Sequence, residues 1–539
     1  MSVCEVLHVI AKAASAANIK KATIFLRRRH LVALLSAQVR GMTSVPAYGR
    51  AGVKMWDSAR VRTLKEVETA DKKNVVYWMA RDQRVQDNWA LLHAQDLASA
   101  KGGVVSVAFW LGESDYPTAR HYDFMIRGLR EVAGACETLG IEFALLKDED
   151  CRSAVSQFAE ERLASCVVCD FTPLKTGRER RDGLAKAAEN FSVYEVDAHN
   201  VVPVWTASDK QEVGARTLRP KIQRQLSRFL TEFPTVKKQE EQKTTKIDWD
   251  ALLKKETVDK SVKPITWCDP GEKAAHAALA SFASDGRLER FADDRNNPCK
   301  DGVSNLSPYF HFGQLAPQRA ALEVQRISKE IKKTEAGAKV FLEEAVVRRE
   351  LADNYCFYQA NYDSIDGAAQ WARDSLEVHA SDPREHVYSR EQLEDAKSHE
   401  DIWNAAQRQM VQTGKMPGFM RMYWCKKILE WTETPAEAFE TALYLNDKYS
   451  IDGSDPNGYV GVAWSICGIH DMGWKERPVF GKIRYMNYAG CKRKFDIRAY
   501  AGKFPPPNAI DSYFTKKTTK KKEPDAASVK AAKKAKKET

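Results

Sequence analysis

Three tryptophans in the C-terminal half of the chain are spaced so that an electron could pass between their indole rings. Trp424 and Trp431 lie seven residues apart in a segment of helical periodicity, and seven steps of about 100° return to nearly the same helix face. Trp403 begins the preceding helical segment. Indoles within a few ångströms of one another can relay an electron, but indoles in a core usually only pack. The spacing by itself favours core packing.

Residues 304–313 could bind a phosphate group. Ser307 precedes Pro308, a pair typical of a helix N-cap followed by proline at the first helical position. The free backbone N–H groups of such a helix start, together with the hydroxyls of Ser304 and Ser307, suit a pyrophosphate. An ordinary capped helix is the simpler interpretation of the same residues.

Two further segments place carboxylates among apolar residues. Residues 343–355 are too charged to be buried all round and too apolar to be wholly exposed, so a solvated helix face with internal ion pairs is the simple interpretation. In residues 444–458, Asp452 precedes Gly453, and a carboxylate beside glycine lets backbone and side chain approach the edge of a planar ring. A plain Asp-Gly turn between helices is an equal alternative.

The helices that would position these side chains lie between residues 272 and 503. Apolar residues recur there with helical spacing, over residues 314–331, 336–359, 399–413, 418–431, 435–449 and 458–468. Long helices that carry Trp, Arg, Glu and Asn on inward faces indicate a cofactor cavity rather than a simple bundle.

From residue 73, strands and helices alternate. Short apolar runs predict strands at residues 74–80, 103–111, 142–146, 166–171 and 193–197, with helical segments between them. This alternation predicts a doubly wound parallel sheet. The Gly-rich dinucleotide loop is absent. Cys166 and Cys169 share a strand and point to opposite faces, which favours buried thiols, and no metal site is predicted.

The chain has 539 residues, of which 43% are hydrophobic, and this length favours two or three domains. It contains no apolar run long enough to span a membrane, and its eleven cysteines lack paired spacing, which favours a reducing compartment. The net charge of +11 is concentrated at the two ends: residues 1–54 carry +8 and residues 516–539 carry +7. Any nucleic-acid site in the folded part must therefore be a local basic patch.

These observations predict an α/β domain followed by an all-α domain. The predicted segments are a basic extension at 1–72, an α/β domain at 73–205, a linker at 206–271, a helical domain at 272–505 and a lysine-rich tail at 506–539. The extension is either disordered or a targeting peptide for a mitochondrion or plastid. The tail's lysine clusters favour the nucleus.

The start of the tail also resembles the motif that binds the sliding clamp of replication. Ile510, Tyr513 and Phe514 can share one face of a single helical turn, although Pro507 replaces the usual leading glutamine.

Taken together, the order and spacing of these segments resemble the cryptochrome/photolyase family, most closely its class II cyclobutane pyrimidine dimer photolyases. The resemblance spans residues 74–503. It is carried by VVYWMARDQRVQDNWALLHAQ, DDRNNP, SNLSPYFHFGQL, EEAVVRRELADNYCFY, DIWNAAQRQMVQTGKMPGFMRMYWCKKILEW, LNDKYSIDGSDPNGYVGVAWSICGIHD and FGKIRYMNYAGCKRKFD. It implies an antenna-type α/β domain, a helical domain that holds a U-shaped FAD, and a monomer.

The resemblance also implies a role for each matching residue. Those that bind FAD are Ser304, Asn305, Leu306, Ser307, Arg349, Arg421, Asn446, Asp452, Gly453 and Asp455, with Asn446 facing the flavin N5. Those that hold the flipped dimer are Glu344, Met422 and Trp464. The electron relay is Trp424, Trp403, Trp431 and finally Tyr388, which reverses the core-packing interpretation. A basic patch for DNA comprises Arg295, Lys475, Lys482, Arg484, Lys492, Arg493 and Lys494.

The implied activity is light-driven repair of pyrimidine dimers in single- or double-stranded DNA by one electron from excited reduced FAD. Glu344, if protonated, could donate a hydrogen bond to a pyrimidine carbonyl. A deazaflavin antenna is an expectation that no residue specifies. The alternatives are a cryptochrome-type photoreceptor without repair and a lesion-binding protein without reduced flavin. A member specific for the (6-4) photoproduct would be expected to present histidines near Glu344 and Met422, and these segments lack them.

Overall fold

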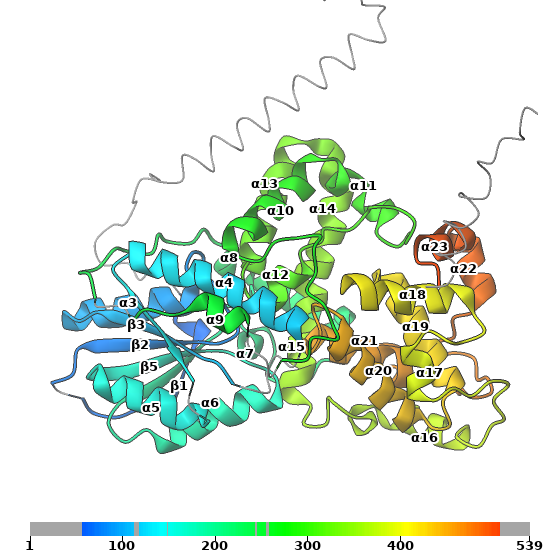
Figure 1. Cartoon of the computed structure of the whole chain (residues 1–539), viewed down its shortest axis with the longest axis horizontal. Coiled ribbons are helices and arrows are strands. Elements are labelled where there is room, and N and C mark those ends of the chain that lie inside the picture. The colour runs from blue at the N-terminus through cyan, green and yellow to red at the C-terminus, as the bar shows by residue number, and fades with distance from the viewer. Residues whose placement is uncertain are drawn as a thin grey trace, which may run out of the picture.

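The computed structural model describes residues 57–506, with gaps at 70, 113–117, 148, 243–244 and 255–257 (Figure 1). The predicted targeting peptide, the lysine clusters and the clamp motif at Ile510, Tyr513 and Phe514 lie outside the described residues. Among the described residues, no helix combines the length and hydrophobicity needed to cross a membrane.

The first domain is built on a six-stranded sheet in the order β1-β6-β5-β2-β3-β4. Its strands are β1 (Val61–Lys65), β2 (Asn74–Met79), β3 (Val105–Trp110), β4 (Glu142–Leu146), β5 (Ala164–Asp170) and β6 (Ser192–Val196). The five predicted strands are all present and parallel, which confirms the doubly wound sheet. β1 is the addition: it pairs antiparallel with β6 at the edge of the sheet.

β1 lies inside the segment that the sequence assigned to the basic extension, so the boundary expected at residue 73 is too late. Its sequence, VRTLK, is short and polar on one face, as is usual for an edge strand, and gives little signal of its own. Arg62 on this strand forms an ion pair with Glu195 of β6. The preceding turn η1 (Ser58–Arg60) buries the guanidinium of Arg60 against backbone carbonyls, including that of Val201 at 2.7 Å.

Helices cover both faces of the sheet (Figure 1). They are α3 (Trp89–Lys101), α4 (Ala119–Thr138), α5 (Cys151–Glu161) and α6 (Lys175–Ala187). Alternate strand residues enter separate cores: Cys166 belongs to the cluster with α3 and α4, and Cys169 to the cluster with α5 and α6. The prediction that these two thiols point to opposite faces is therefore confirmed.

The predicted linker contains α7 (Val204–Ala207), α8 (Ala215–Phe229) and α9 (Trp249–Leu253). The 15 residues of α8 form a packed helix, because Leu218, Ile222 and Phe229 share a core with Val346 and Val347 of the helical domain. Much of this segment is thus structural rather than a flexible connection.

The remaining chain forms the helical domain, which occupies the upper and right-hand parts of Figure 1. Its elements are α10 (Glu272–Ser284), α11 (Arg287–Asp294), α12 (Ser307–His311), α13 (Pro317–Glu330), η2 (Lys332–Thr334), α14 (Glu335–Leu342), η3 (Glu343–Arg348), α15 (Arg349–Tyr358), η4 (Ile365–Gly367), α16 (Gln370–Val378), α17 (Arg390–Glu394), α18 (Asp401–Thr413), α19 (Gly418–Trp431), α20 (Pro435–Tyr449), α21 (Pro456–Cys467), α22 (Tyr488–Lys494) and α23 (Ile497–Lys503). The helix predicted over 336–359 is interrupted by η3, which is π-helical.

Two side chains, one partly buried and one buried, join the domains through the buried carboxylate of Asp353. Arg81, which follows β2, donates to both carboxylate oxygens of Asp353 on α15 at 2.7 and 2.9 Å. Asn200 donates to the same carboxylate at 2.9 Å. Because Asp353 is fully buried, these polar contacts between the domains are shielded from solvent.

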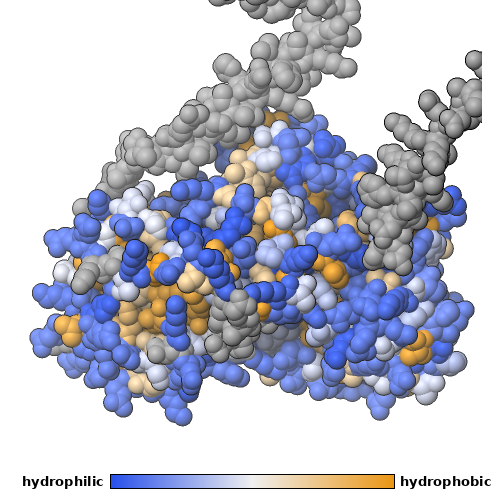
Figure 2. Space-filling view, viewed as in Figure 1, coloured by the Kyte–Doolittle hydropathy of each residue, from blue (hydrophilic) through white to orange (hydrophobic). Residues whose placement is uncertain are grey.

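The outer surface in Figure 2 is mainly hydrophilic, and its largest hydrophobic area in this view lies over the sheet domain.

Candidate functional site

The junction of α20 and α21 leaves a buried amide with little room around it. Asn446 is 1% exposed, and its Nδ2 donates to Asp447 Oδ1 at 2.8 Å. A Cβ at Gly458 would lie 2.9 Å from Nδ2, and a Cβ at Gly453 would lie 2.8 Å from the Cα of Asp447. Both glycines therefore permit close packing of the chain on Asn446 and Asp447; the approach of Gly453 to a planar ring stays a prediction.

Two arginines near this junction keep buried N–H groups without a partner among the described residues. Arg421 pairs with Asp452 at 3.1 Å, as the resemblance implied, but its Nε is unsatisfied. Arg349 donates to the carbonyl of Ala345 at 3.0 Å and to that of His199 at 3.2 Å, while its Nη1 is unsatisfied. Such orphaned donors are costly in a closed core and suit a bound group that carries acceptors.

The loop Ser304–Ser307 has a different helix start from the one predicted. Helix α12 begins at Ser307 itself, its N-cap is Leu306, and no side chain caps it. Asn305 adopts a left-handed conformation with φ of 62°, which aims its side chain at Lys415. The Ser307 hydroxyl is therefore not used as a helix cap, because the cap lies one residue earlier than the Ser-Pro pattern indicates.

Lys415 is a site residue that the sequence analysis missed. Its Nζ donates to Asn305 Oδ1 and lies 5.0 Å from the centre of the Trp267 ring. Desolvation lowers the pKa of Lys415 to about 8, and no ion pair with a carboxylate is present for it among residues 57–506 as described. Asp301 and Asp452 act on Lys415 only at longer range, so this partly buried ammonium suits an anionic ligand. A single lysine after a glycine gives no pattern from which this could be inferred.

The aromatic side chains form one contiguous row. Trp424 and Trp403 stack with ring centres 6.2 Å apart, Trp403 meets Trp431 at 5.5 Å, and Trp431 meets Tyr388 at 5.6 Å. The three indoles are almost completely buried, whereas Tyr388 is partly exposed. Arg421 and Trp424 are three residues apart on α19 and so lie on nearly the same helix face. The row of rings therefore begins near Arg421 and leads to Tyr388 at the protein surface.

The residues expected to hold a dimer lie on three elements. Glu344 is in the π-helical segment η3, and such segments often occur at functional sites. Its carboxylate forms an ion pair with Arg295 at 2.9 Å, so the pair must open before Glu344 can act as the hydrogen-bond donor that the sequence suggested. Met422 is on α19, and Trp464 on α21 lies under the ammonium of Lys426 at 4.6 Å.

The predicted basic patch is on the loop after α21 and on α22. Lys475, Lys482 and the last turn of α22 (Lys492, Arg493 and Lys494) are exposed. Arg484 is different, because both its Nε and Nη2 donate to Asp471, at 2.6 and 2.8 Å. Arg484 also stacks on Trp474, which is 47% exposed and was not predicted as a site residue.

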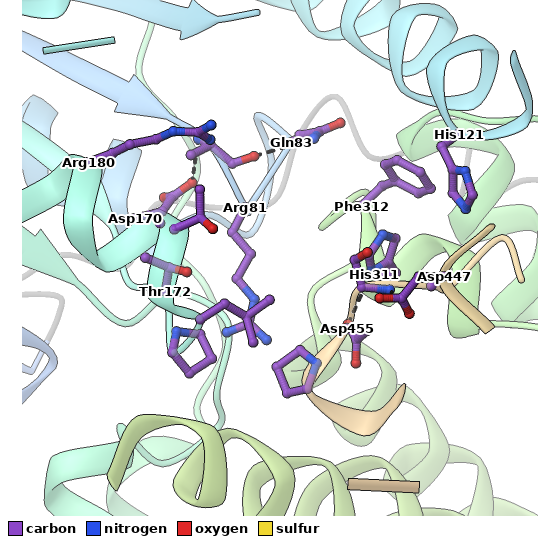
Figure 3. A pocket seen from close by; sticks show the side chains of 18 of the residues that line it. Arg81, Gln83, His121, Asp170, Thr172, Arg180, His311, Phe312, Asp447 and Asp455 are labelled. Carbon is purple, nitrogen blue, oxygen red and sulfur yellow. Dashed lines mark hydrogen bonds and ion pairs between the residues drawn. The ribbon is translucent and has the colours of Figure 1, made fainter. Parts of the chain in front are cut away.

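A cavity of about 690 Å³ lies where the sheet meets the helical domain (Figure 3). On one side are residues from the carboxyl ends of β2 and β5 and the loops after them, including Arg81 and Asp170; on the other are His311 and Asp455. Asp455 was predicted to bind FAD, but in the structure it caps α21 and accepts from His311 Nδ1 at 3.2 Å. The strand order reverses between β2 and β5, which is where doubly wound sheets bind ligands.

Both a family model and individual named relatives match this chain. A family model described as DNA photolyase matches residues 75–238. A deoxyribodipyrimidine photo-lyase from Potorous tridactylus is 52% identical, over 80% of this chain and 81% of that protein. One from Oryza sativa is 51% identical, over 84% and 92%. This chain belongs to the DNA photolyase family.

Solved photolyase and cryptochrome structures share the fold of this family member at low sequence identity. A class III photolyase from Agrobacterium tumefaciens has a TM-score of 0.60 and 19% identity, and covers 82% of this chain and 87% of its own. A cryptochrome from Synechocystis has a TM-score of 0.63 and 14% identity, over 80% and 88%. The two-domain arrangement predicted from the sequence is therefore the photolyase fold.

The photolyase family implies a flavin chromophore, and the residues present fit FAD. The unsatisfied donors of Arg349 and Arg421 suit its carbonyl and phosphate oxygens, and the ammonium of Lys415 suits its pyrophosphate. Gly453 and Gly458 allow the backbone to pack closely on Asp447 and Asn446, which fixes the position of the Asn446 amide. These side chains come from α15, α19, α20 and α21 and the loops beside them, which is why their proximity is not visible in the sequence.

Proposed function

We propose that this photolyase splits cyclobutane pyrimidine dimers in DNA with light and belongs to the class II branch. The observation that carries the proposal is the continuous row of rings from Tyr388 to Trp424, which ends three residues from Arg421 and its unsatisfied Nε. Reduced FAD held there by Arg349, Arg421 and Asn446 would supply the light-driven transfer of one electron to the dimer and its return. No net oxidation occurs, so the activity is that of a lyase.

The residues of the chain hold the reacting partners and control the surroundings. The amide of Asn446 can either donate to or accept from the flavin N5, which a carboxylate at neutral pH cannot do. Trp464 and Met422 form an apolar wall for the extruded dimer. Glu344 contacts a pyrimidine once substrate displaces Arg295, which then becomes free for a phosphate.

The exposed lysines and arginines of the loop and α22 bind DNA phosphates without reading sequence. Trp474 adds an exposed aromatic ring at which an unpaired base can stack. Arg484 is held by Asp471 and packs on both Trp464 and Trp474. We therefore propose that it positions these two rings in addition to contributing positive charge to the surface.

A photoreceptor without repair activity is the alternative that the sequence left open. The cryptochrome neighbour matches at only 14% identity and so supports the fold alone, whereas relatives at about 50% identity are named deoxyribodipyrimidine photo-lyase. The repair function is therefore favoured over pure signalling.

The cavity between the domains is the place we propose for a second, light-collecting pigment of the deazaflavin type. Trp78, Phe109 and Trp110 give it aromatic walls, and Arg81 and Arg180 provide polar edges. Purified protein that absorbs beyond the flavin bands, and loses this absorption in a Gly177→Trp variant, would support the assignment. The nuclear location and the clamp contact remain predictions, because both depend on the tail after residue 506.

The direct test of the function is irradiation of the purified, chemically reduced protein with dimer-containing DNA. Blue light should restore intact pyrimidines on single-stranded and duplex substrates, and no repair should occur in darkness. Protein that binds FAD and is fully reduced but leaves dimers unrepaired would contradict the proposal.

Replacement of Lys415 should weaken FAD binding. Lys415→Met removes the cation at the phosphate loop, and we expect at least about tenfold weaker FAD binding, as for loss of one charge-assisted contact. Lys415→Arg should retain most of the affinity, and Lys397→Met, on the exposed surface, should retain all of it. Because the pKa of Lys415 is lowered to about 8, the affinity should also fall as the pH rises above that value, and a flat titration would exclude the phosphate role.

His379 should make DNA binding depend on pH. Its ring contacts Asp382 at 2.5 Å and Glu476 at 3.1 Å, and Asp382 in turn accepts from the N–H of Val479, so the histidine ties the DNA-binding loop to α16. These carboxylates raise the pKa of His379 above 6.5. Because its pKa is raised, His379 is protonated below about pH 6.5, and its contacts with Asp382 and Glu476 are then complete. These contacts, which we call the His379 clasp, are lost as the pH rises through the pKa of His379 in the folded protein.

We therefore expect affinity for dimer-containing DNA to decline between about pH 6 and pH 9 more steeply in the natural protein than in His379→Gln. Fluorescence anisotropy with a labelled oligonucleotide measures this difference. Arg384, which faces Asp382, is the neighbouring cation, and Arg384→Gln serves as the matched control. Identical pH profiles for the natural protein and His379→Gln would show that the clasp does not position the loop.

A further inference from the structure

The outer end of the aromatic row carries a histidine that none of the proposed roles uses. His399 lies immediately before α18, is exposed to solvent, and its ring centre is 5.1 Å from that of Trp431. The hydroxyl of Tyr388 is 2.8 Å from His399 Nδ1. The last donor of the row therefore has a direct hydrogen-bond partner at the protein surface.

Two contacts of the Tyr388 oxygen favour donation from its hydroxyl to His399. The backbone N–H of His399 donates to the oxygen of Tyr388 at 3.1 Å, so that oxygen already accepts one hydrogen. The hydrogen of the Tyr388 hydroxyl can then point at Nδ1 when that ring nitrogen is unprotonated. The distance lies within the range at which a side chain can take a proton during a reaction.

We infer that His399 accepts the phenolic proton of Tyr388 when the row reduces the flavin. The inference rests on the proposed function, because it requires the row to conduct. The oxidant is the light-excited oxidised flavin, whose missing electron is supplied in turn by Trp424, Trp403 and Trp431. An electron then passes from Tyr388 to the oxidised Trp431 as the proton moves from the phenol oxygen to Nδ1. The products are neutral Trp431, a neutral Tyr388 radical and protonated His399, so charge and atoms balance.

The surroundings of His399 keep its ring neutral and able to accept. Burial and the neighbouring His386 lower the pKa of His399 below 6.5. The rings of His386 and His399 lie 3.9 Å apart, so protonation of one disfavours protonation of the other. The charged groups nearby are Glu385, Glu400 and Lys427, and Lys427 is itself paired with Glu400 and Glu430 at 2.8 Å.

Proton acceptance makes the charge separation last. A tyrosine that keeps its proton after losing an electron is a strong acid and a strong oxidant, and it would recover the electron from Trp431. With the proton on an exposed histidine, the hole remains on Tyr388 as a neutral radical, where a reductant in solution can reach it. The role of His399 is therefore to stabilise the neutral Tyr388 radical at the protein surface.

Flash photolysis of the full-length protein with oxidised FAD tests the inference through the absorption of the tyrosyl radical. The natural protein should form this radical after the tryptophan signal, more slowly in D₂O, and with a yield that falls as the pH drops below the lowered pKa of His399. His399→Phe keeps an aromatic ring on Trp431 but removes the acceptor, and should reduce the yield of tyrosyl radical by at least about tenfold.

His386→Phe is the matched control, because it alters a ring that stacks on His399 but does not contact the Tyr388 hydroxyl; it should retain the radical. Flavin content and early tryptophan signals should be equal in all variants. An unchanged tyrosyl yield and isotope effect in His399→Phe would overturn the inference while leaving the row and the repair function intact. Absence of any tryptophan signal in the natural protein would instead remove the relay, and the inference with it.

Discussion

Trp403→Phe should reduce the rate of flavin photoreduction on the order of 100-fold, which corresponds to about 2.7 kcal/mol of activation free energy. Trp403 is the ring that contacts both neighbours, with centres 6.2 Å from Trp424 and 5.5 Å from Trp431. A phenyl ring is far harder to oxidise than an indole, so an electron would have to cross the whole gap in one step. The measurement is the growth of reduced-flavin absorbance under constant blue light with an external reductant.

The same variant should repair dimers nearly as well as the natural protein once it has been reduced chemically, because repair does not use the row. Trp249→Phe is the control, since Trp249 packs on Phe143 in the α/β domain, far along the chain from the row. Loss of repair in chemically reduced Trp403→Phe would assign Trp403 to structure, and unchanged photoreduction would place the electron path elsewhere.

Arg81→Met should destabilise the protein by about 3–5 kcal/mol, the usual cost of removing one partner from a buried ion pair. Its guanidinium makes two hydrogen bonds to Asp353, whose side chain is fully buried, and thereby joins the two domains. Without Arg81, the buried carboxylate of Asp353 keeps only the hydrogen bond from Asn200 among those described. Thermal unfolding followed by circular dichroism should show a clearly lower midpoint.

Arg152→Met provides the comparison for this effect. Arg152 pairs with Asp150, but both side chains are about half exposed, so its removal should change stability by less than about 1 kcal/mol. Equal midpoints for Arg81→Met and Arg152→Met would show that the domain contact is not maintained by this pair. Arg81→Met should also alter the cavity between the domains, since Arg81 lines it.

Local sequence patterns were sufficient for most of the secondary structure. The predicted helices 418–431 and 435–449 coincide with α19 and α20, and the five predicted strands are the parallel core of the sheet. The exceptions have physical reasons. β1 is a short edge strand with weak patterning, and η3 is a π-helical turn, which does not alter apolar periodicity enough to be seen.

The sequence also proposes roles for many site residues, because their motifs match the photolyase family, and these roles stay predictions. The seven-residue spacing of Trp424 and Trp431 was sufficient to place both rings on one face of a helix. It could not decide whether they only pack or also conduct, since that depends on Trp403 from another helix.

Only the tertiary structure decided which side chains from distant segments meet. Lys415 reaches Asn305 across 110 residues, Arg81 reaches Asp353 across 272, and Arg295 meets Glu344. Periodicity reports which face of an element is apolar, but it carries no information about which element that face will contact. The sequence therefore determined the elements and the chemistry available on them, and packing determined which groups meet at the sites that we propose for flavin binding, electron transfer and proton acceptance.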